Sequence, residues 1–102
     1  MNRIDVTGFA SALAIDDSVE VLADGLSIAL CRNEAELFAV ANNCTHADAR
    51  LTDGFVMGHF IECPLHQAQF DLASGELIAG PQCAALRTYR EVRDGERVFV
   101  EL

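Results

Sequence analysis

The sequence of 102 residues contains no lysine and no tryptophan, and it has only two prolines and one tyrosine. Its seven basic residues are all arginine and stand against sixteen acidic residues, which gives a formal net charge of −9. A chain with so little positive charge repels the phosphates of nucleic acids and anionic membrane surfaces, so we expect neither as a partner. The same charge favours a basic protein as partner.

Long hydrophobic runs are also missing. The longest stretch without a charged residue spans residues 37–47, which is eleven residues, whereas a membrane-spanning helix needs about 20. The first residues carry no apolar segment of the length of a signal peptide. We therefore expect a soluble, cytoplasmic protein, in which the four cysteines are metal ligands or buried thiols before they are disulfides.

The length fits a single domain spanning residues 1–102. Turn residues at short intervals separate short apolar runs, and these runs predict strands over residues 3–7, 19–22, 26–31, 37–41, 55–57, 60–62, 91–93 and 97–101. Asp24-Gly25 and Asp94-Gly95 predict tight hairpins. This pattern predicts an all-β fold, a small antiparallel β-sandwich or barrel. The one helix-like segment, residues 9–15, is expected to form a single turn or a loop.

Two segments, residues 42–50 and 63–70, interrupt the strand pattern and carry cysteine and histidine. The first contains Cys44 and His46 as C-x-H, the second contains Cys63 and His66 as C-x-x-H, and sixteen residues lie between the two motifs. Two thiolates and two imidazoles suit tetrahedral zinc, although zinc sites usually keep the two cysteines together. They also suit a [2Fe–2S] cluster with both cysteines on one iron and both histidines on the other. The residues alone leave both centres open.

The pattern resembles the signature of Rieske-type [2Fe–2S] ferredoxins of bacterial aromatic-ring-hydroxylating dioxygenase systems. The similarity continues through residues 51–54, 70–71, 74–76, 80–81 and 98–100. The resemblance implies one Rieske cluster per chain, with Cys44 and Cys63 on the inner iron and His46 and His66 on the outer iron. It also implies a cluster-binding subdomain at about residues 42–82, inserted into the β-sandwich or barrel, with Gly80-Pro81 in a third loop over the cluster.

The resemblance further implies a one-electron carrier that is not an enzyme by itself. The expected electron donor is an NAD(P)H-dependent flavoprotein ferredoxin reductase, and the expected acceptor is a terminal oxygenase of aromatic hydrocarbon catabolism. We expect the carrier to be a monomer. Two alternatives are kept at this point. One is a Rieske subunit of another redox enzyme, such as the small subunit of nitrite reductase, and the other is a structural zinc-binding interaction domain.

Several positions differ from high-potential members of the family. Asp48 and Leu65 stand where some members have disulfide-forming cysteines, and Ala68 and Phe70 stand where high-potential members have serine and tyrosine. Fewer hydrogen bonds to the cluster stabilise its reduced state less, so we expect a potential at the low end of the range from about −150 to +300 mV. Gln67 lies where many members have glycine, which argues against a left-handed residue there.

The remaining candidates have simpler interpretations. Cys31 and Cys83 are expected to be small buried hydrophobic residues, and His59 is expected to lie on the surface. The phenylalanines are expected to pack in the core or along strands rather than to form an electron path; this concerns Phe9, Phe38, Phe55, Phe60 and Phe99.

Overall fold

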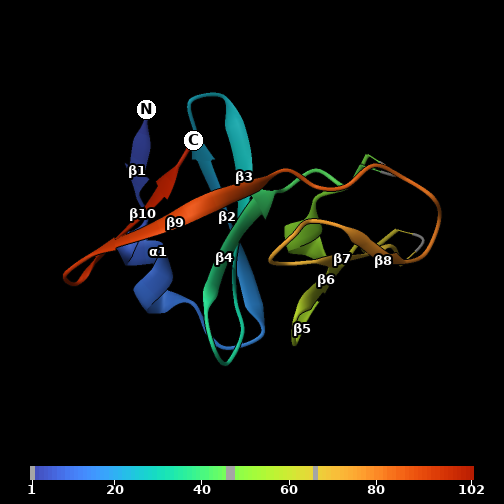
Figure 1. Cartoon of the computed structure of the whole chain (residues 1–102), viewed down its shortest axis with the longest axis horizontal. Coiled ribbons are helices and arrows are strands. Elements are labelled where there is room, and N and C mark those ends of the chain that lie inside the picture. Colours follow the sequence, from blue (N-terminus) through green and yellow to red (C-terminus); the bar gives the residue numbers. More distant parts are fainter. Residues whose placement is uncertain (1, 46–47, 66) are drawn as a thin grey trace.

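A computed structural model of the chain describes residues 2–45, 48–65 and 67–102 (Figure 1). The described strands form a six-stranded sheet in the order β1-β10-β9-β4-β3-β2 and a four-stranded sheet in the order β5-β6-β7-β8, and the pairings are antiparallel. The elements run in chain order as β1 (Arg3–Asp5), α1 (Thr7–Ala12), β2 (Asp17–Ala23), β3 (Leu26–Arg32), β4 (Leu37–Ala41), the 3₁₀ helix η1 (Leu51–Asp53), β5 (Phe55–Met57), β6 (Phe60–Glu62), β7 (Gln69–Asp71), β8 (Leu77–Ala79), β9 (Thr88–Asp94) and β10 (Arg97–Glu101).

The two long hairpins of the larger sheet form where the sequence places its tightest turns. Asp24 and Gly25 have φ values of 51° and 77°, the left-handed conformation that a two-residue hairpin needs, and β2 pairs with β3 along its whole length. In the turn from β9 to β10 only Gly95 has a positive φ, 63°, and it occupies the first position between the paired residues Asp94 and Arg97. The sheet curls so that α1 lies below it at one end (Figure 1).

Strands β3 and β4 separate two hydrophobic cores. In β3, Ile28 and Leu30 face the core of the curled sheet, whereas Ala29 and Cys31 face the core shared with the smaller sheet. In β4, Ala39 and Val40 divide between the two cores in the same way. A strand that is buried on both faces needs a continuous apolar run, and β3 has one. The smaller sheet, on the right of Figure 1, is thereby packed against the larger one.

The prediction of an all-β, antiparallel fold is confirmed in a structure that is nearly all-β, and most predicted strands lie within two or three residues of the observed ones. The helix begins at Thr7 and ends at Ala12, so it starts earlier than residues 9–15 suggest. The short strands β7 and β8 were not predicted. Two phenylalanines contradict the packing prediction, because Phe9 and Phe55 are 44% and 62% exposed. Among the described residues, no helix is both long and apolar enough to cross a membrane.

Candidate metal centre

The first cysteine loop (loop one) leaves the larger sheet at the end of β4 and returns at η1. Its neck is closed by a bridge between Asn43 and Arg50 and by a hydrogen bond from the Cys44 N–H to the Ala49 carbonyl at 2.9 Å. Cys44 is buried at the base of the loop. His46, the other predicted ligand of this loop, lies outside the described residues.

The buried side chain of Asn42 fixes this neck to both strands beneath it. Its Nδ2 donates to Glu20 Oε2 at 3.2 Å and to Ser27 Oγ at 3.0 Å, and its Oδ1 accepts from the Thr52 N–H at 2.9 Å. Its backbone donates to the Ser27 carbonyl and accepts from the Leu51 N–H. Asn42 is the only polar residue among the described residues that is fully buried, and every polar group of it is paired. We refer to Asn42 with these partners as the loop-one hub.

The far side of loop one is held by the carboxylate of Glu20, which also accepts a hydrogen bond from Asn42. Arg50 Nη1 donates to Glu20 Oε1 at 3.1 Å, and its Nε donates to Asp53 at 3.2 Å. A hydrogen bond from the Ser27 hydroxyl is the main cause that lowers the pKa of Glu20, with Asn42 and Arg50 adding to it. Glu20 is therefore ionised at neutral pH and joins both ends of loop one to strand β2.

The second cysteine loop follows β6 directly and is closed by a hydrogen bond from the Cys63 N–H to the Ala68 carbonyl at 2.8 Å. Gln67 has a φ of 58°, so the left-handed turn exists without glycine, contrary to the sequence prediction. The reversal needed to bring Ala68 back to Cys63 imposes this conformation on a residue that disfavours it. His66, the predicted ligand beside it, lies outside the described residues.

A third loop, between β8 and β9, packs against both cysteine loops. A Cβ added to Gly80, whose φ is 108°, would stand 2.8 Å from the Cα of Ala68, so only glycine allows this close approach. Thr45 Oγ1 of loop one donates to the Ala84 carbonyl at 2.5 Å. Cys83 packs against the core that contains Cys44 and Cys63. The loop carrying Gly80 therefore contacts both cysteine loops.

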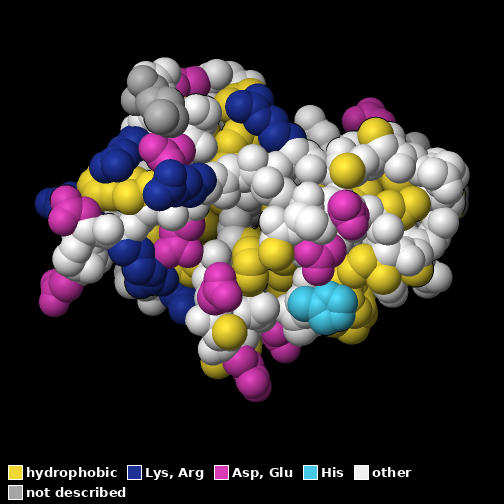
Figure 2. Space-filling model, in the orientation of Figure 1, with side chains coloured by type: hydrophobic (Ala, Val, Ile, Leu, Met, Phe, Trp, Pro, Cys, Tyr) yellow, Lys and Arg dark blue, Asp and Glu magenta, His cyan; other side chains and the backbone are white. Residues whose placement is uncertain are grey.

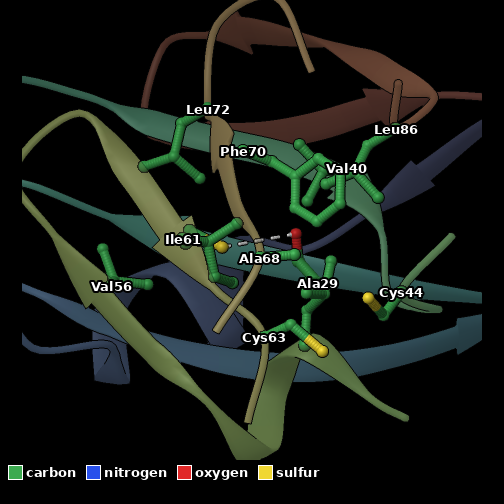
Figure 3. Packing of buried hydrophobic residues seen from close by; sticks show 12 residues of the cluster. Ala29, Val40, Cys44, Val56, Ile61, Cys63, Ala68, Phe70, Leu72 and Leu86 are labelled. Carbon is green, nitrogen blue, oxygen red and sulfur yellow. Dashed lines mark hydrogen bonds between the residues drawn. The ribbon is translucent and has the colours of Figure 1, made fainter. Parts of the chain in front are cut away.

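The thiols of Cys44 and Cys63 come from different loops and meet in one apolar setting. Cys44 is 6% exposed and Cys63 is fully buried, and Figure 3 shows their sulfur atoms pointing toward the space between the loops. Burial, followed by the neighbouring Cys44 thiol, raises the pKa of Cys63 to about 11. Two neutral thiols gain little free energy from lying close together, whereas a metal cation stabilises both as thiolates. The donor set that is described thus fits a metal centre with one cysteine from each loop.

The wall beside these thiols is apolar. Ala68 and Phe70 are fully buried in the same core as Cys44 and Cys63 (Figure 3), and neither carries a hydroxyl. Asp48 is exposed and Leu65 is 46% exposed, and all four cysteines of the chain are free thiols. The described part of the centre therefore has no disulfide between its loops.

The other cysteine and histidine candidates lie outside the two cysteine loops, and two of the three behave as expected. His59 is exposed on the surface and contacts Asp71 at 3.3 Å. Cys31 is fully buried, and burial raises its pKa to about 12. Cys83 is only partly buried. Sequence reasoning missed the roles of Asn42 and Glu20, because a buried asparagine at the end of a strand is indistinguishable in sequence from a loop residue.

Comparison with known proteins agrees with this centre. Residues 5–90 match the model of the Rieske [2Fe-2S] domain. The chain is 41% identical over 86 residues to the ferredoxin component of the naphthalene 1,2-dioxygenase system of Pseudomonas aeruginosa, a match that covers 84% of this chain and 83% of that protein. It is 32% identical to the structure of the ferredoxin of carbazole 1,9a-dioxygenase from Nocardioides aromaticivorans IC177, with a TM-score of 0.82 and 88% of each chain covered.

Two further structures bear on partners and on the alternatives. The complex of reduced oxygenase and oxidized ferredoxin in carbazole 1,9a-dioxygenase matches at 27% identity, with a TM-score of 0.83, and covers 89% of this chain and 85% of that one. A putative nitrite reductase small subunit from Mycobacterium tuberculosis matches at 22% identity, with a TM-score of 0.80, and covers 97% and 91% of the two chains. The second likeness shows the shared fold alone. The match over residues 5–90, with one buried cysteine in each of two facing loops, establishes that this chain belongs to the Rieske [2Fe-2S] domain family, whose members bind a Rieske-type [2Fe–2S] cluster.

Proposed function

We propose that this chain is the electron carrier of an aromatic-ring-hydroxylating dioxygenase system. It receives single electrons from an NAD(P)H-dependent flavoprotein reductase and gives them to a terminal oxygenase. The observation that carries the proposal is the pair of facing, buried thiols in a chain 41% identical to a naphthalene dioxygenase ferredoxin component. In the proposed ligand set every coordination position is filled by protein or sulfide, so the carrier offers no open position to oxygen or an aromatic substrate.

The proposed ligands are Cys44 and Cys63 on the inner iron and His46 and His66 on the outer iron. The proposed boundaries are a single Rieske domain over residues 1–102 with a cluster-binding subdomain at about residues 42–82. In support, both cysteine loops, η1 and the whole four-stranded sheet fall within those inner boundaries.

When bound, the cluster supplies a reversible one-electron couple whose potential is raised by its two neutral histidine ligands. The chain's own residues tune that couple. Ala68 and Phe70 close the site to water on one side and donate no side-chain hydrogen bond. Because hydrogen bonds to cluster sulfurs favour the reduced state, their absence at these two positions supports a potential at the low end of the Rieske range.

The end of the molecule that bears the loops suits close contact with another protein. Neither residues 63–70 nor residues 77–86 contain a charged side chain, and Leu65 and Ile78 are 46% and 47% exposed. An uncharged surface of this kind loses its water at little cost when another protein binds. The redox centre of that protein can then approach the cluster closely, which shortens the distance of electron transfer. We propose that the protein acts as a monomer in the cytoplasm, where a reductase and an oxygenase take turns at this end.

Reconstitution with the reductase and oxygenase of a naphthalene dioxygenase system tests the proposal. We expect NADH to reduce the protein through the reductase, and the reduced protein to be reoxidised by the oxygenase. The Cys44→Ser variant should support neither step. An intact cluster that exchanges electrons with neither component would contradict the proposal.

The alternatives have less support. The nitrite reductase subunit rests on a shared fold at 22% identity. The zinc domain does not agree with membership of the Rieske family.

A further inference from the structure

The smaller sheet turns one face away from the core, and this face carries large apolar side chains. The register places Phe55 opposite Glu62, and Met57 opposite Phe60, which in turn lies opposite Asp71. Phe55 and Met57 are 62% and 43% exposed, and the other three residues are half-buried. The alternate residues of these strands, such as Val56 and Ile61, face the core instead. We call Phe55, Met57, Phe60, Glu62 and Asp71 the outer patch.

The charge around the outer patch has one sign. Residues 51–86 contain four acidic residues and no lysine or arginine, and the acids are Asp53, Glu62, Asp71 and Glu76. On the face shown in Figure 2, the described histidine lies among acidic and hydrophobic side chains, while the arginines gather over the larger sheet. Asp53 pairs with Arg50 at 3.2 Å, whereas among the described residues no arginine pairs with Glu62, Asp71 or Glu76. An apolar centre beside carboxylates without an arginine partner attracts a surface rich in lysine or arginine.

The outer patch adjoins the second cysteine loop. Glu62 directly precedes Cys63, and Phe55 lies across from Glu62 in the sheet. At Gly54, immediately before Phe55, an added Cβ would stand 3.1 Å from the Cδ of Pro64 in that loop. A protein seated on Phe55 therefore also reaches the loop that bears two of the proposed ligands.

We propose that the outer patch is a docking surface for a basic redox protein that presents an apolar contact centre ringed by lysine or arginine. The proposal rests on the proposed electron-carrier function and extends the contact from the cluster end onto the sheet. A second copy of this chain does not fit the outer patch, because it would bring the same carboxylates and a net charge of −9.

Calorimetric titration of the oxidised holoprotein with horse-heart cytochrome c, a lysine-rich redox protein with an exposed apolar haem edge, tests the proposal. We expect binding at low ionic strength that weakens as salt rises. Phe55→Ser should weaken binding about tenfold, as expected for an aromatic anchor at the centre of an interface. Glu62→Gln keeps an acceptor for Gln69, so it should weaken binding severalfold and flatten the salt dependence.

Two controls make the result specific. Leu22→Ser alters a leucine of β2 that is 73% exposed, and its affinity should stay within twofold of the wild type. Leu65→Ser separates the outer patch from the cluster end. No binding of cytochrome c, or loss of affinity in Leu65→Ser with none in Phe55→Ser, would overturn the proposal. The titration needs no reductase or oxygenase, so failure of the proposed electron route would not alter its outcome.

Discussion

Replacing Asn42 by alanine removes the loop-one hub with a change of one side chain. The substitution deletes three partly buried hydrogen bonds, and the two that the Asn42 side chain donates contribute about 1 kcal/mol each. It also leaves the Thr52 N–H without its acceptor, at a cost of about 1–3 kcal/mol. The loss of roughly 3–5 kcal/mol is a large part of the stability of a domain of this size. The expected fall in Tm is roughly 15–30 °C.

Circular dichroism melting of the holoprotein measures this loss, and bleaching of the visible absorption measures cluster retention. We expect both to fail at lower temperature in Asn42→Ala than in the wild type. Asn43→Ala is the matched control, because the neighbouring asparagine is exposed and its removal should change stability by less than about 0.5 kcal/mol. Asn42→Asp should also destabilise, since it replaces the donor that faces Glu20 with a second carboxylate. Equal melting temperatures for Asn42→Ala and Asn43→Ala would refute the role given to the hub.

Three further predictions concern the same loops and the nearby core. Ala68→Ser combined with Phe70→Tyr should raise the reduction potential by about 40–90 mV, because hydroxyl donors favour the more negative reduced cluster; an unchanged potential in voltammetry would show that these side chains do not face the sulfurs. Gln67→Gly should raise the free energy of unfolding by about 0.5–1 kcal/mol in urea titrations, because glycine adopts a φ of 58° without strain. A lower free energy of unfolding in the variant would show that Gln67 is not strained. Burial raises the pKa of Cys31 to about 12, so the folded state keeps a proton that the unfolded state loses above about pH 8.5. Stability should therefore fall with pH from about 9 to 12, by at most about 1.4 kcal/mol per pH unit from this group, and Cys31→Ala should lessen that slope.

The fold was predictable where local chemistry decides the structure. Asp24-Gly25 supplies the left-handed residues of a hairpin, and the apolar run of β3 is long enough to be recognised alone. Strands β7 and β8 have three residues each, too few for a pattern to be recognised, and they form because β7 pairs with the edge of β6 and β8 with the edge of β7. The helix starts early because Thr7 donates to the carboxylate of Asp5 at the end of β1, a local contact that composition does not reveal.

The meeting of the two cysteines was predictable from the sequence, and the supports of their loops were not. The spacing of Cys44 and Cys63 indicated a two-loop centre, and the structure brings the two thiols together. The conformation of Gln67 was predicted wrongly, because tertiary closure by the Cys63–Ala68 hydrogen bond outweighs the preference of glutamine. Asn42 was missed because its partners come from β2, β3 and η1, which only the fold brings together.

The central claim is that Cys44, His46, Cys63 and His66 hold a Rieske cluster, and pulsed EPR of the reduced protein tests it most directly. Two imidazole ligands on the reducible iron must give hyperfine couplings to two nitrogens, and the spin should integrate to one electron per pair of irons. We predict both couplings in the wild type and the loss of the signal in Cys44→Ser. A wild-type spectrum without strongly coupled nitrogen, or a Cys44→Ser variant with an intact signal, would contradict the ligand set.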